Sequence, residues 1–309
     1  MLLLCVCLPT LIGLAARLSW LAELATHFAW QYAIALPVCL VYCLATRRKR
    51  LAALAALCLL LNFRQLAPLY SSPTVTPVAD TSSTQVDPLR VLTLNVLTAN
   101  RKFDRVLELI RREDPEVVLL LEVDQPWVDA MAPLEASYPQ HRHRVRSDNF
   151  GVAFYTRMPT RELQIREFGG GEVPSVVAEI DWQGEPLTIV GAHPLPPMSA
   201  RQSAMRNNQL AAIGEFVSEL PHAAVVLGDL NITPFSPHFR DLLESGDLRD
   251  SGRGYGWQPT WAGRFKWLGL PIDHVLYSSD LQVLDRRVGP HVGSDHRPVL
   301  VDFKRIGGK

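Results

Sequence analysis

Three long apolar segments before residue 71 limit where this chain can fold. Residues 1–16 and 26–46 contain no Asp, Glu, Lys or Arg. A helix needs roughly 20 mostly apolar residues to cross a bilayer core of about 30 Å. The second segment has that length, the first reaches it if it continues to Leu24, and residues 51–63 reach it if their helix continues to Tyr70. The sequence therefore predicts about three transmembrane helices, at about 1–24, 26–46 and 51–70.

A basic cluster between the second and third segments predicts the orientation in the membrane. Residues 47–50 are Arg-Arg-Lys-Arg, and such clusters stay on the cytoplasmic side. Three spans then place everything after residue 70 outside the cytoplasm. Two alternatives stay open. In the first alternative, residues 1–16 are a signal peptide, although this segment lacks a charged start. In the second, the third apolar segment is an interfacial helix, and the rest of the chain is then cytoplasmic.

The composition of the remaining chain indicates a short linker and one cysteine-free domain. Residues 71–88 are rich in Ser, Thr and Pro without a hydrophobic period, as in an exposed linker. All five cysteines precede residue 60, so residues 89–309 can hold neither a disulfide nor a thiolate metal site. The formal net charge is zero, which disfavours a protein that binds duplex DNA by neutralising many phosphates.

From residue 89 onward, apolar runs typical of buried strands end in polar side chains. Fully buried strands appear in a sequence as short continuous apolar runs. Between the first two runs, residues 103–113 have apolar side chains at helical spacing, so strands alternate with helices and the fold class is α/β. The polar residues at or just beyond the strand ends are Asn95, Glu122, His193, Asp229, Asn231, Asp273, Asp295 and His296.

These polar strand ends have an ordinary explanation one at a time but not together. A lone Asp at the end of a strand commonly caps a turn. Glu122 is harder to explain this way, because a carboxylate beside the buried run VVLLL needs a partner or a metal. Asp229 and Asn231 are two residues apart, so in an extended chain they face the same side. Together the groups suit Mg²⁺ or Mn²⁺ and acid–base chemistry rather than zinc.

In their order along the chain, these residues resemble the motif series of a known superfamily. Asn95, Glu122 and His193, followed by GDLN at 228–231, IDH at 272–274 and SDH at 294–296, resemble the endonuclease/exonuclease/phosphatase superfamily, the deoxyribonuclease I-like group. The resemblance covers roughly residues 89–304, and GDxN followed further along the chain by SDH is a specific pattern. Leu97, Leu121 and Ala192 depart from residues that are common in the family, which argues against an abasic-site endonuclease.

The resemblance implies a fold and a metal site. The fold is a four-layer α/β/β/α sandwich with its active site at one edge. The turn NITPFSPHF and the TW at 260–261 are most similar to a bacterial branch tethered to the inner membrane, in which three N-terminal spans precede the domain. Residues 89–309 would then be a periplasmic catalytic domain. Glu122 is implied to bind the cation, Mg²⁺ or Mn²⁺, with Asn95 beside it and Asp295 near enough to join.

The resemblance also implies the catalytic residues. His296 would act as general base or as an electrophilic contact to the phosphate, with Asp273 orienting its ring. Asp229 would orient the attacking water or protonate the leaving oxygen. Asn231 and His193 would donate hydrogen bonds to the phosphate oxygens.

Other residues are weaker candidates for substrate contact. Arg206 and Asn208 follow the loop after His193, and a solvated helix face is the simpler interpretation of both. The aromatic residues Trp257, Trp261, Phe265 and Trp267 could stack on a base, contact lipid or cover the edge of a sheet, and the last use is the commonest for Trp.

The resulting prediction is a membrane-anchored, divalent-metal-dependent phosphodiester hydrolase. Its substrate would be a nucleic acid or a phospholipid, and no obligate protein partner is evident. One alternative is a catalytically silent phosphoesterase fold that serves as a binding protein, although Glu122, Asp229, Asp273 and His296 are all present. The other is a protein whose main work is done by the apolar helices, which lack the paired charges that this would require.

Overall fold

The computed structural model describes residues 2–71, 87–262 and 267–306. Most of the predicted linker 71–88 and the predicted contact residue Phe265 lie outside these residues. Two parts follow each other along the chain, a group of apolar helices and a β-sandwich, and the sandwich begins at Leu89.

The sandwich contains two six-stranded sheets, ordered β11-β12-β1-β2-β4-β3 and β5-β6-β7-β8-β10-β9. Each sheet has one parallel pair at its centre, β1 with β2 and β7 with β8, and its other pairs are antiparallel. The strands are β1 (Leu89–Asn95), β2 (Val117–Leu121), β3 (Gln140–Arg144), β4 (Val152–Thr156), β5 (Thr160–Glu167), β6 (Pro174–Trp182), β7 (Glu185–Gly191), β8 (Ala224–Asp229), β9 (Leu248–Asp250), β10 (Asp273–Ser278), β11 (Leu281–Val288) and β12 (Val299–Arg305).

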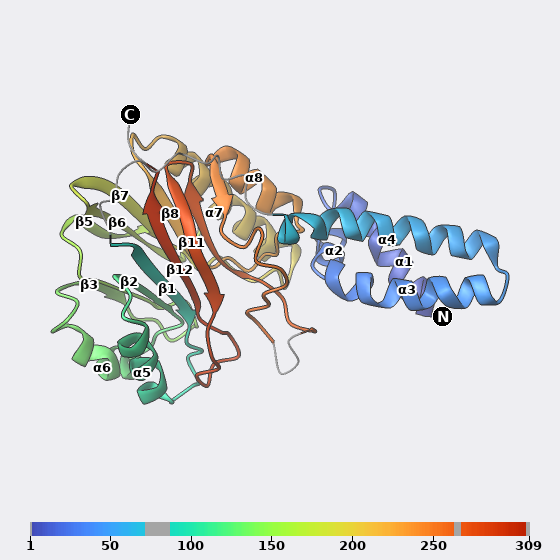
Figure 1. The fold of residues 1–309 in the computed structure, drawn as a ribbon. Coiled ribbons are helices and arrows are strands. Elements are labelled where there is room, and N and C mark those ends of the chain that lie inside the picture. Colours follow the sequence, from blue (N-terminus) through green and yellow to red (C-terminus); the bar gives the residue numbers. More distant parts are fainter. Residues whose placement is uncertain (1, 72–86, 263–266, 307–309) are drawn as a thin grey trace.

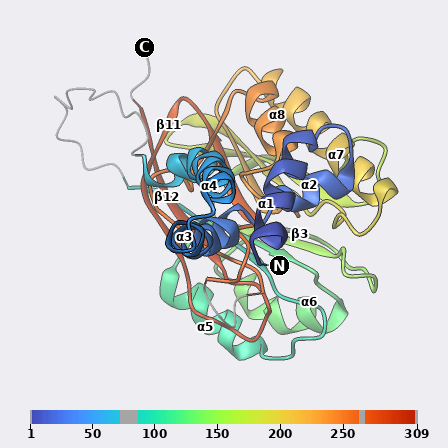
Figure 2. The same ribbon diagram turned by 90° about the vertical axis from the view of Figure 1, so that its right-hand side faces the viewer.

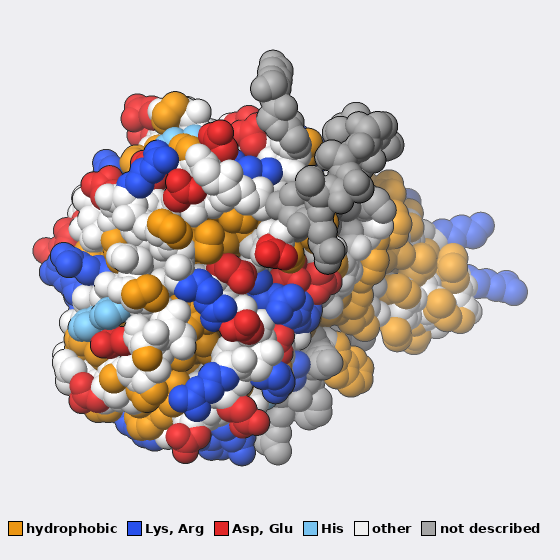
Figure 3. All heavy atoms as spheres, turned by 60° about the vertical axis from the view of Figure 1, so that its left-hand side comes forward, with side chains coloured by type: hydrophobic (Ala, Val, Ile, Leu, Met, Phe, Trp, Pro, Cys, Tyr) orange, Lys and Arg blue, Asp and Glu red, His pale blue; other side chains and the backbone are white. Residues whose placement is uncertain are grey.

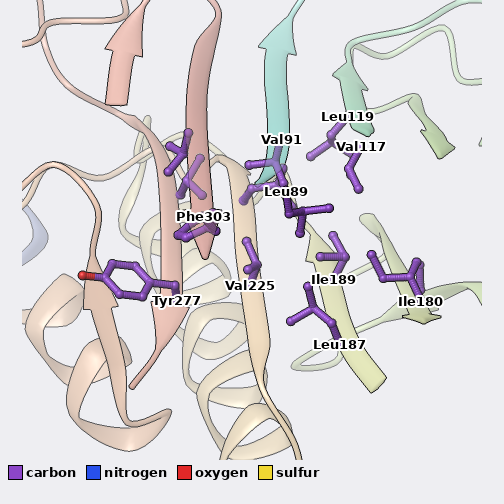
Figure 4. Packing of buried hydrophobic residues seen from close by; sticks show 14 of the residues in the cluster. Leu89, Val91, Val117, Leu119, Ile180, Leu187, Ile189, Val225, Tyr277 and Phe303 are labelled. Atoms are coloured by element: carbon purple, nitrogen blue, oxygen red, sulfur yellow. The ribbon is translucent and has the colours of Figure 1, made fainter. Parts of the chain in front are cut away.

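The inner faces of the two sheets form the main core. Val91 and Val117 of one sheet pack with Ile189 and Val225 of the other, and all four are fully buried (Figure 4). The outer faces of the central strands are covered as well, so both alternating sets of side chains must be apolar. This explains why the strands appear in the sequence as unbroken apolar runs.

Helices cover the outer face of each sheet, which makes four layers (Figure 1). On the first sheet, apolar side chains of α5 (Phe103–Glu113) and α6 (Gln125–Met131) pack against β1 and β2. On the second, α7 (Ala200–Ser218) and α8 (Pro237–Ser245) pack in the same way. The predicted helix over 103–113 is confirmed, and the α/β/β/α arrangement agrees with the predicted fold class.

The helices that precede the sandwich form an arm that projects from it (Figure 1). Only α4, among the described helices, is by itself long and apolar enough to cross a membrane, while α2 and α3 form a pair bent by 66°. The predicted first helix over 1–24 is broken between Gly13 and Ser19. The prediction of about three transmembrane helices is therefore not confirmed and stays a prediction. The helices are α1 (Leu2–Ile12), α2 (Trp20–Thr26), α3 (Ala29–Ala45) and α4 (Lys49–Tyr70), with the 3₁₀ turn η1 (Gly13–Ala15).

The arm is joined to the sandwich by a buried group of polar side chains, which we call the clamp. Glu23 of α2 accepts hydrogen bonds from Arg206 at 2.6 Å, from Ser236 at 2.6 Å and from Ser203 at 3.3 Å. Nearby, the ring of Trp30 on α3 stacks on Trp257 with centroids 4.9 Å apart. Seen along the arm, α2 lies next to α7 (Figure 2). The clamp thus fixes the near end of the arm to the sandwich.

Candidate active site

The predicted strand-end residues meet at one edge of the sandwich. The carboxyl ends of β1, β2, β7 and β8 lie at this edge, together with the amino ends of the antiparallel strands β10 and β12. Asp273, the first residue of β10, is the direct register neighbour of Asp229, the last residue of β8. Both sheets therefore contribute to one site.

Five of these side chains are buried in mutual contact, and we call them the edge cluster. Asp229 Oδ2 lies 3.2 Å from Asn95 Nδ2, 3.4 Å from His193 Nε2 and 3.6 Å from His296 Nε2. His296 Nδ1 lies 2.9 Å from Asp273 Oδ2. None of the five is more than 4% exposed. The structure thus brings together Asn95, His193, Asp229, Asp273 and His296 as predicted.

Two hydroxyl groups hold the edge cluster in position. Ser294 Oγ donates a hydrogen bond to the Asn95 carbonyl at 2.7 Å and accepts one from His296 N at 3.0 Å. Thr260 Oγ1 accepts from Asp273 N at 3.1 Å. From the sequence these residues had no predicted role, although Ser294 is the first residue of the SDH motif. For Ser294 the signal is its place in the motif, because a short hydroxyl side chain there can bond to the neighbouring backbone.

Several residues around the site adopt the left-handed backbone conformation. Among them are Glu122 (φ 61°), Asn231 (φ 50°) and Leu97 (φ 61°), a conformation that costs free energy for residues other than Gly and concentrates at functional sites. Gly228 has a φ of 139°, and a Cβ there would lie 2.0 Å from the Ala192 carbonyl oxygen. Only glycine therefore fits before Asp229, which explains the first residue of GDLN.

Burial and neighbouring charges shift the pKa values of the edge cluster. Burial disfavours protonated His296, but the carboxylates of Asp273 and Asp229 outweigh it and raise its pKa to about 10. Burial also disfavours ionised Asp229, but His296 and His193 outweigh it and lower its pKa. The mutual attraction of these groups thus favours protonated His296 and ionised Asp229.

The donors at this edge suit a hard divalent cation. Carboxylate oxygens of Asp229 and Asp273 lie within 4.8 Å of each other, and Asp273 Oδ1 has no hydrogen-bond partner among the described residues. Glu122 borders the same cavity and accepts from Asn95 Nδ2 at 2.8 Å. Carboxylate and amide oxygens are the ligands that Mg²⁺ and Mn²⁺ prefer, so these residues fit the predicted cofactor.

Two of the predicted ligands have other partners in this arrangement. Asn95 Oδ1 accepts from Leu97 N at 3.0 Å, so the amide presents its nitrogen to the carboxylates. Asp295 is exposed and its Oδ2 accepts from Trp261 Nε1 at 3.1 Å. To ligate a cation, Asn95 would have to turn its amide. The metal-ligand roles stay predictions.

Arg206 and Asn208 do not reach the cavity at the edge cluster. Arg206 is completely buried in the clamp, where its guanidinium pairs with Glu23 and also donates to the Asn231 carbonyl at 3.1 Å. Asn208 lies on an exposed part of α7 and does not line this cavity. We therefore correct their assignment as substrate contacts, and Arg206 supports the backbone of Asn231 from behind.

Asn231 lies close to Asp229, as the spacing of GDLN predicts. Its backbone N–H donates to Asp229 Oδ1 at 3.0 Å, and its Nδ2 donates to the Pro194 carbonyl at 2.9 Å. The side chain also lines the cavity. In this arrangement Asn231 joins the loop after β8 to the loop after β7.

The predicted aromatic residues lie in different places. The ring of Trp261 lies 6.4 Å from the ring of His296. Trp257 stacks on the arm, and Trp267 is 62% exposed. Trp257 lies between the two parts of the chain, because it stacks on Trp30 of the arm and also on Phe235 of the sandwich, with centroids 6.2 Å apart. Another aromatic residue, Phe150, lies over His193 with ring centroids 5.0 Å apart, and nothing in the sequence had singled it out.

A family comparison agrees with the geometry of the site. The model of the Endonuclease/Exonuclease/phosphatase family matches residues 92–296. The chain belongs to this family. Its matched segment begins in β1 and ends at His296, so it contains the whole edge cluster. Members of the endonuclease/exonuclease/phosphatase family are typically hydrolases that act on phosphodiester bonds.

Solved structures of the family share the fold at low sequence identity. The human Nocturnin catalytic domain with bound sulfate is 18% identical, with a TM-score of 0.59 over 71% of this chain and 95% of that one. Humanized D. rerio TDP2 is 16% identical, with a TM-score of 0.58 over 70% and 99%. Sphingomyelinase C from Streptomyces griseocarneus is 17% identical, with a TM-score of 0.53 over 70% and 99%. No curated protein sequence matches significantly.

Proposed function

We propose that this chain is a membrane-anchored, divalent-metal-dependent phosphodiester hydrolase. The observation that carries the proposal is the edge cluster, in which two carboxylates, two imidazoles and a carboxamide are buried within hydrogen-bonding reach of one another. Burying so many charged groups is unfavourable unless they bind something or neutralise each other. Such clusters are candidates for catalytic sites.

Glu122, with Asn95 and Asp295, would hold Mg²⁺ or Mn²⁺. When bound, the cation supplies charge stabilisation to a non-bridging phosphate oxygen. Glu122 is only partly buried and borders the cavity, so it can be reached by an ion that enters with the substrate.

The side chains of the edge cluster have complementary tasks. Asp229 is ionised and accepts a hydrogen bond from the attacking water, which orients the water towards phosphorus. His296 is protonated and donates to a phosphate oxygen, which favours the electrophilic role over the general base. Asp273 holds the other ring nitrogen of His296 at 2.9 Å. His193 and Asn231 would donate further hydrogen bonds to the phosphate.

The arm would anchor the enzyme in a bacterial inner membrane. The proposed organisation is 1–70 as membrane helices, 71–88 as linker and 89–309 as the catalytic domain. The basic residues 47–50 are exposed at the turn between α3 and α4, and a cytoplasmic position for them would place the catalytic domain in the periplasm. An alkaline phosphatase fusion after residue 88 tests this: it should be active, and an inactive fusion would contradict the orientation.

The comparisons are compatible with two substrate classes. One similar structure is a sphingomyelinase, and another is D. rerio TDP2 complexed with a single strand DNA product. At identities of 17% and 16% these likenesses concern the fold. A phospholipid and a nucleic acid are therefore the candidate phosphodiesters.

The test of this function uses the full chain in detergent. Hydrolysis of bis(4-nitrophenyl) phosphate and of the monoester 4-nitrophenyl phosphate is measured with Mg²⁺, Mn²⁺ or EDTA. We expect cleavage of the diester that EDTA abolishes and that falls sharply in Asp229→Asn and His296→Ala. No metal-dependent cleavage by the folded wild type would instead support the silent binding protein.

A further inference from the structure

The cavity at the edge cluster has a second wall that comes from the arm. It has a volume of about 620 Å³ and reaches from Asp229 and His296 to Trp20, Leu24 and Phe28. A cavity of this size is typical of small-molecule sites. One part is polar and is lined by His193, Asp229 and His296 of the edge cluster, whereas the other is lined by apolar side chains of the arm.

The clamp makes the arm a permanent wall of this cavity. Glu23, which lies between Trp20 and Leu24 on α2, is 1% exposed and pairs with fully buried Arg206. Breaking such a buried pair is costly. The apolar side chains of α2 are therefore held next to the catalytic groups without needing a conformational change.

One residue that lines the cavity carries a buried polar atom without a partner in the described part of the chain. His27 is 5% exposed and lines the cavity. Its Nδ1 lies 2.8 Å from Thr233 Oγ1, while its Nε2 has no hydrogen-bond partner among the described residues. A buried nitrogen of this kind is unfavourable unless a ligand satisfies it.

The apolar end of the cavity continues into the apolar surface of the arm. Leu18 and Leu21, on the segment that forms the wall, are 87% and 60% exposed. Figure 3 shows a mainly hydrophobic arm with Lys and Arg at its far end, next to a sandwich of mixed charge. With 22 residues, α4 is about 33 Å long at about 1.5 Å per residue, close to the thickness of a bilayer core. If α4 spans the bilayer as proposed above, its far end with the basic turn lies at one membrane surface, and the near end of the arm, which lines the cavity, lies at the other.

Among the described residues, the cavity offers a polynucleotide little positive charge. Its described lining contains four acidic residues and neither Lys nor Arg. Nucleic-acid grooves rely on cationic side chains for the phosphates that flank the reacting one. A molecule with one phosphodiester and an apolar tail matches both ends of the cavity. The acidic residues are Glu122, Asp148, Asp229 and Asp295.

We propose that the substrate is a membrane phospholipid, with its phosphodiester at the edge cluster and one acyl chain in a subsite formed by Trp20, Leu24 and Phe28. A polar group between phosphate and chain would form a hydrogen bond with His27 Nε2. This inference rests on the proposed function and adds a substrate class to it. The arm then serves both as the anchor and as part of the binding site.

The test compares two synthetic diesters, methyl 4-nitrophenyl phosphate and octyl 4-nitrophenyl phosphate, with the full chain in one fixed detergent. Each methylene of the octyl chain that becomes buried raises the binding constant about fourfold. With three or four methylenes buried, kcat/KM for the octyl diester should exceed that for the methyl diester by roughly 60- to 250-fold. In Leu24→Ala this preference should fall roughly fivefold or more. The matched control is Leu21→Ala on the exposed side of the same helix, which should keep the preference and both rates. Detergent micelles take up the octyl diester to the same extent in the assays of all three proteins. A difference in preference between wild type, Leu24→Ala and Leu21→Ala therefore reports the subsite alone.

The outcomes separate this proposal from the general function. Equal kcat/KM for both diesters in the wild type, or the same preference in Leu24→Ala as in Leu21→Ala, overturns the acyl subsite and leaves the hydrolase intact. Faster cleavage of a single-stranded oligonucleotide than of the octyl diester also overturns it. No hydrolysis of any diester overturns the proposed function itself.

Discussion

The clamp and the edge cluster both bury charged side chains, and they differ in how completely their polar atoms are paired. In the clamp, both carboxylate oxygens of Glu23 accept hydrogen bonds from Arg206, and each accepts one more from a serine. In the edge cluster, Asp273 Oδ1 and His193 Nδ1 are buried without a partner among the described residues.

Complete and incomplete pairing indicate different uses of a buried charge. A buried ion pair whose atoms are all satisfied needs nothing more and holds two parts of the fold together. A buried polar atom without a partner costs free energy that a ligand can recover. The difference identifies the edge cluster as the place for a ligand and the clamp as structure, although both contain a carboxylate and a cationic side chain.

The largest expected effect comes from changing the edge cluster. Asp229→Asn removes the carboxylate that orients the attacking water, and His296→Ala removes the cation that donates to the phosphate; such losses lower the rate by about 10²–10⁴-fold. The measurement is kcat for a phosphodiester, with circular dichroism as a check of folding. The control is Glu23→Gln, which replaces a buried carboxylate in the clamp instead of one in the edge cluster. If a folded Asp229→Asn variant kept more than a tenth of the activity, the edge cluster would not be the catalytic site.

Changing the clamp should affect stability most. Glu23→Ala leaves the Arg206 guanidinium buried without its carboxylate, and breaking such pairs costs about 3–5 kcal/mol. Thermal unfolding of the full chain in detergent measures the loss. The double variant Glu23→Leu, Arg206→Met removes both charges and should recover most of the stability. A double variant as unstable as the single one would contradict the assignment of the clamp as a simple ion pair.

Metal binding also distinguishes the edge cluster from the clamp, because only the site at the edge cluster should bind a cation. Glu122→Gln removes a negative charge from the proposed site and should weaken Mn²⁺ binding at least about tenfold. The electron paramagnetic resonance signal of free Mn²⁺ measures this without any turnover. Glu23→Gln should leave the affinity unchanged. Equal affinity in wild type and Glu122→Gln would move the cation to other residues.

The smallest effect is expected at a partly exposed ion pair that belongs to neither cluster. The Arg287 guanidinium, 2.7 Å away, lowers the pKa of the Glu113 carboxyl. A lowered pKa in the folded state stabilises the protein above the unfolded pKa of about 4.3, and the contribution is lost as the pH falls below it. Glu113→Gln should therefore cost about 0.5–1 kcal/mol at pH 7 and nearly nothing at pH 3. Unfolding at both pH values checks this, and a pH-independent difference would contradict it.

The sandwich and its edge could be predicted because their signals are local. Continuous apolar runs indicate strands covered on both faces, and polar residues at their ends indicate a shared edge. The spacing of Asp229 and Asn231, followed by Asp295 and His296, was specific enough to suggest the family. Family membership and the contacts of the edge cluster confirm this part.

The clamp could not be predicted because its partners are 183 residues apart in the chain. Arg206 had the character of a substrate contact, since a cationic side chain on a helix after a site loop is often exposed. Its partner did leave a signal, because Glu23 is a lone carboxylate in an apolar segment and such a group needs a counter-ion. The break after Gly13 also depends on tertiary packing, because the helix turns there to place α2 against α7.

The most direct test of the central claim is hydrolysis in H₂¹⁸O. A single turnover of octyl 4-nitrophenyl phosphate by the full chain with Mg²⁺ is followed by mass spectrometry of both products. Attack of water on phosphorus at the edge cluster predicts one ¹⁸O atom in octyl phosphate and none in 4-nitrophenol, with little product from Asp229→Asn. Label in the nitrophenol, or label in octyl phosphate formed equally fast by Asp229→Asn, would contradict the account.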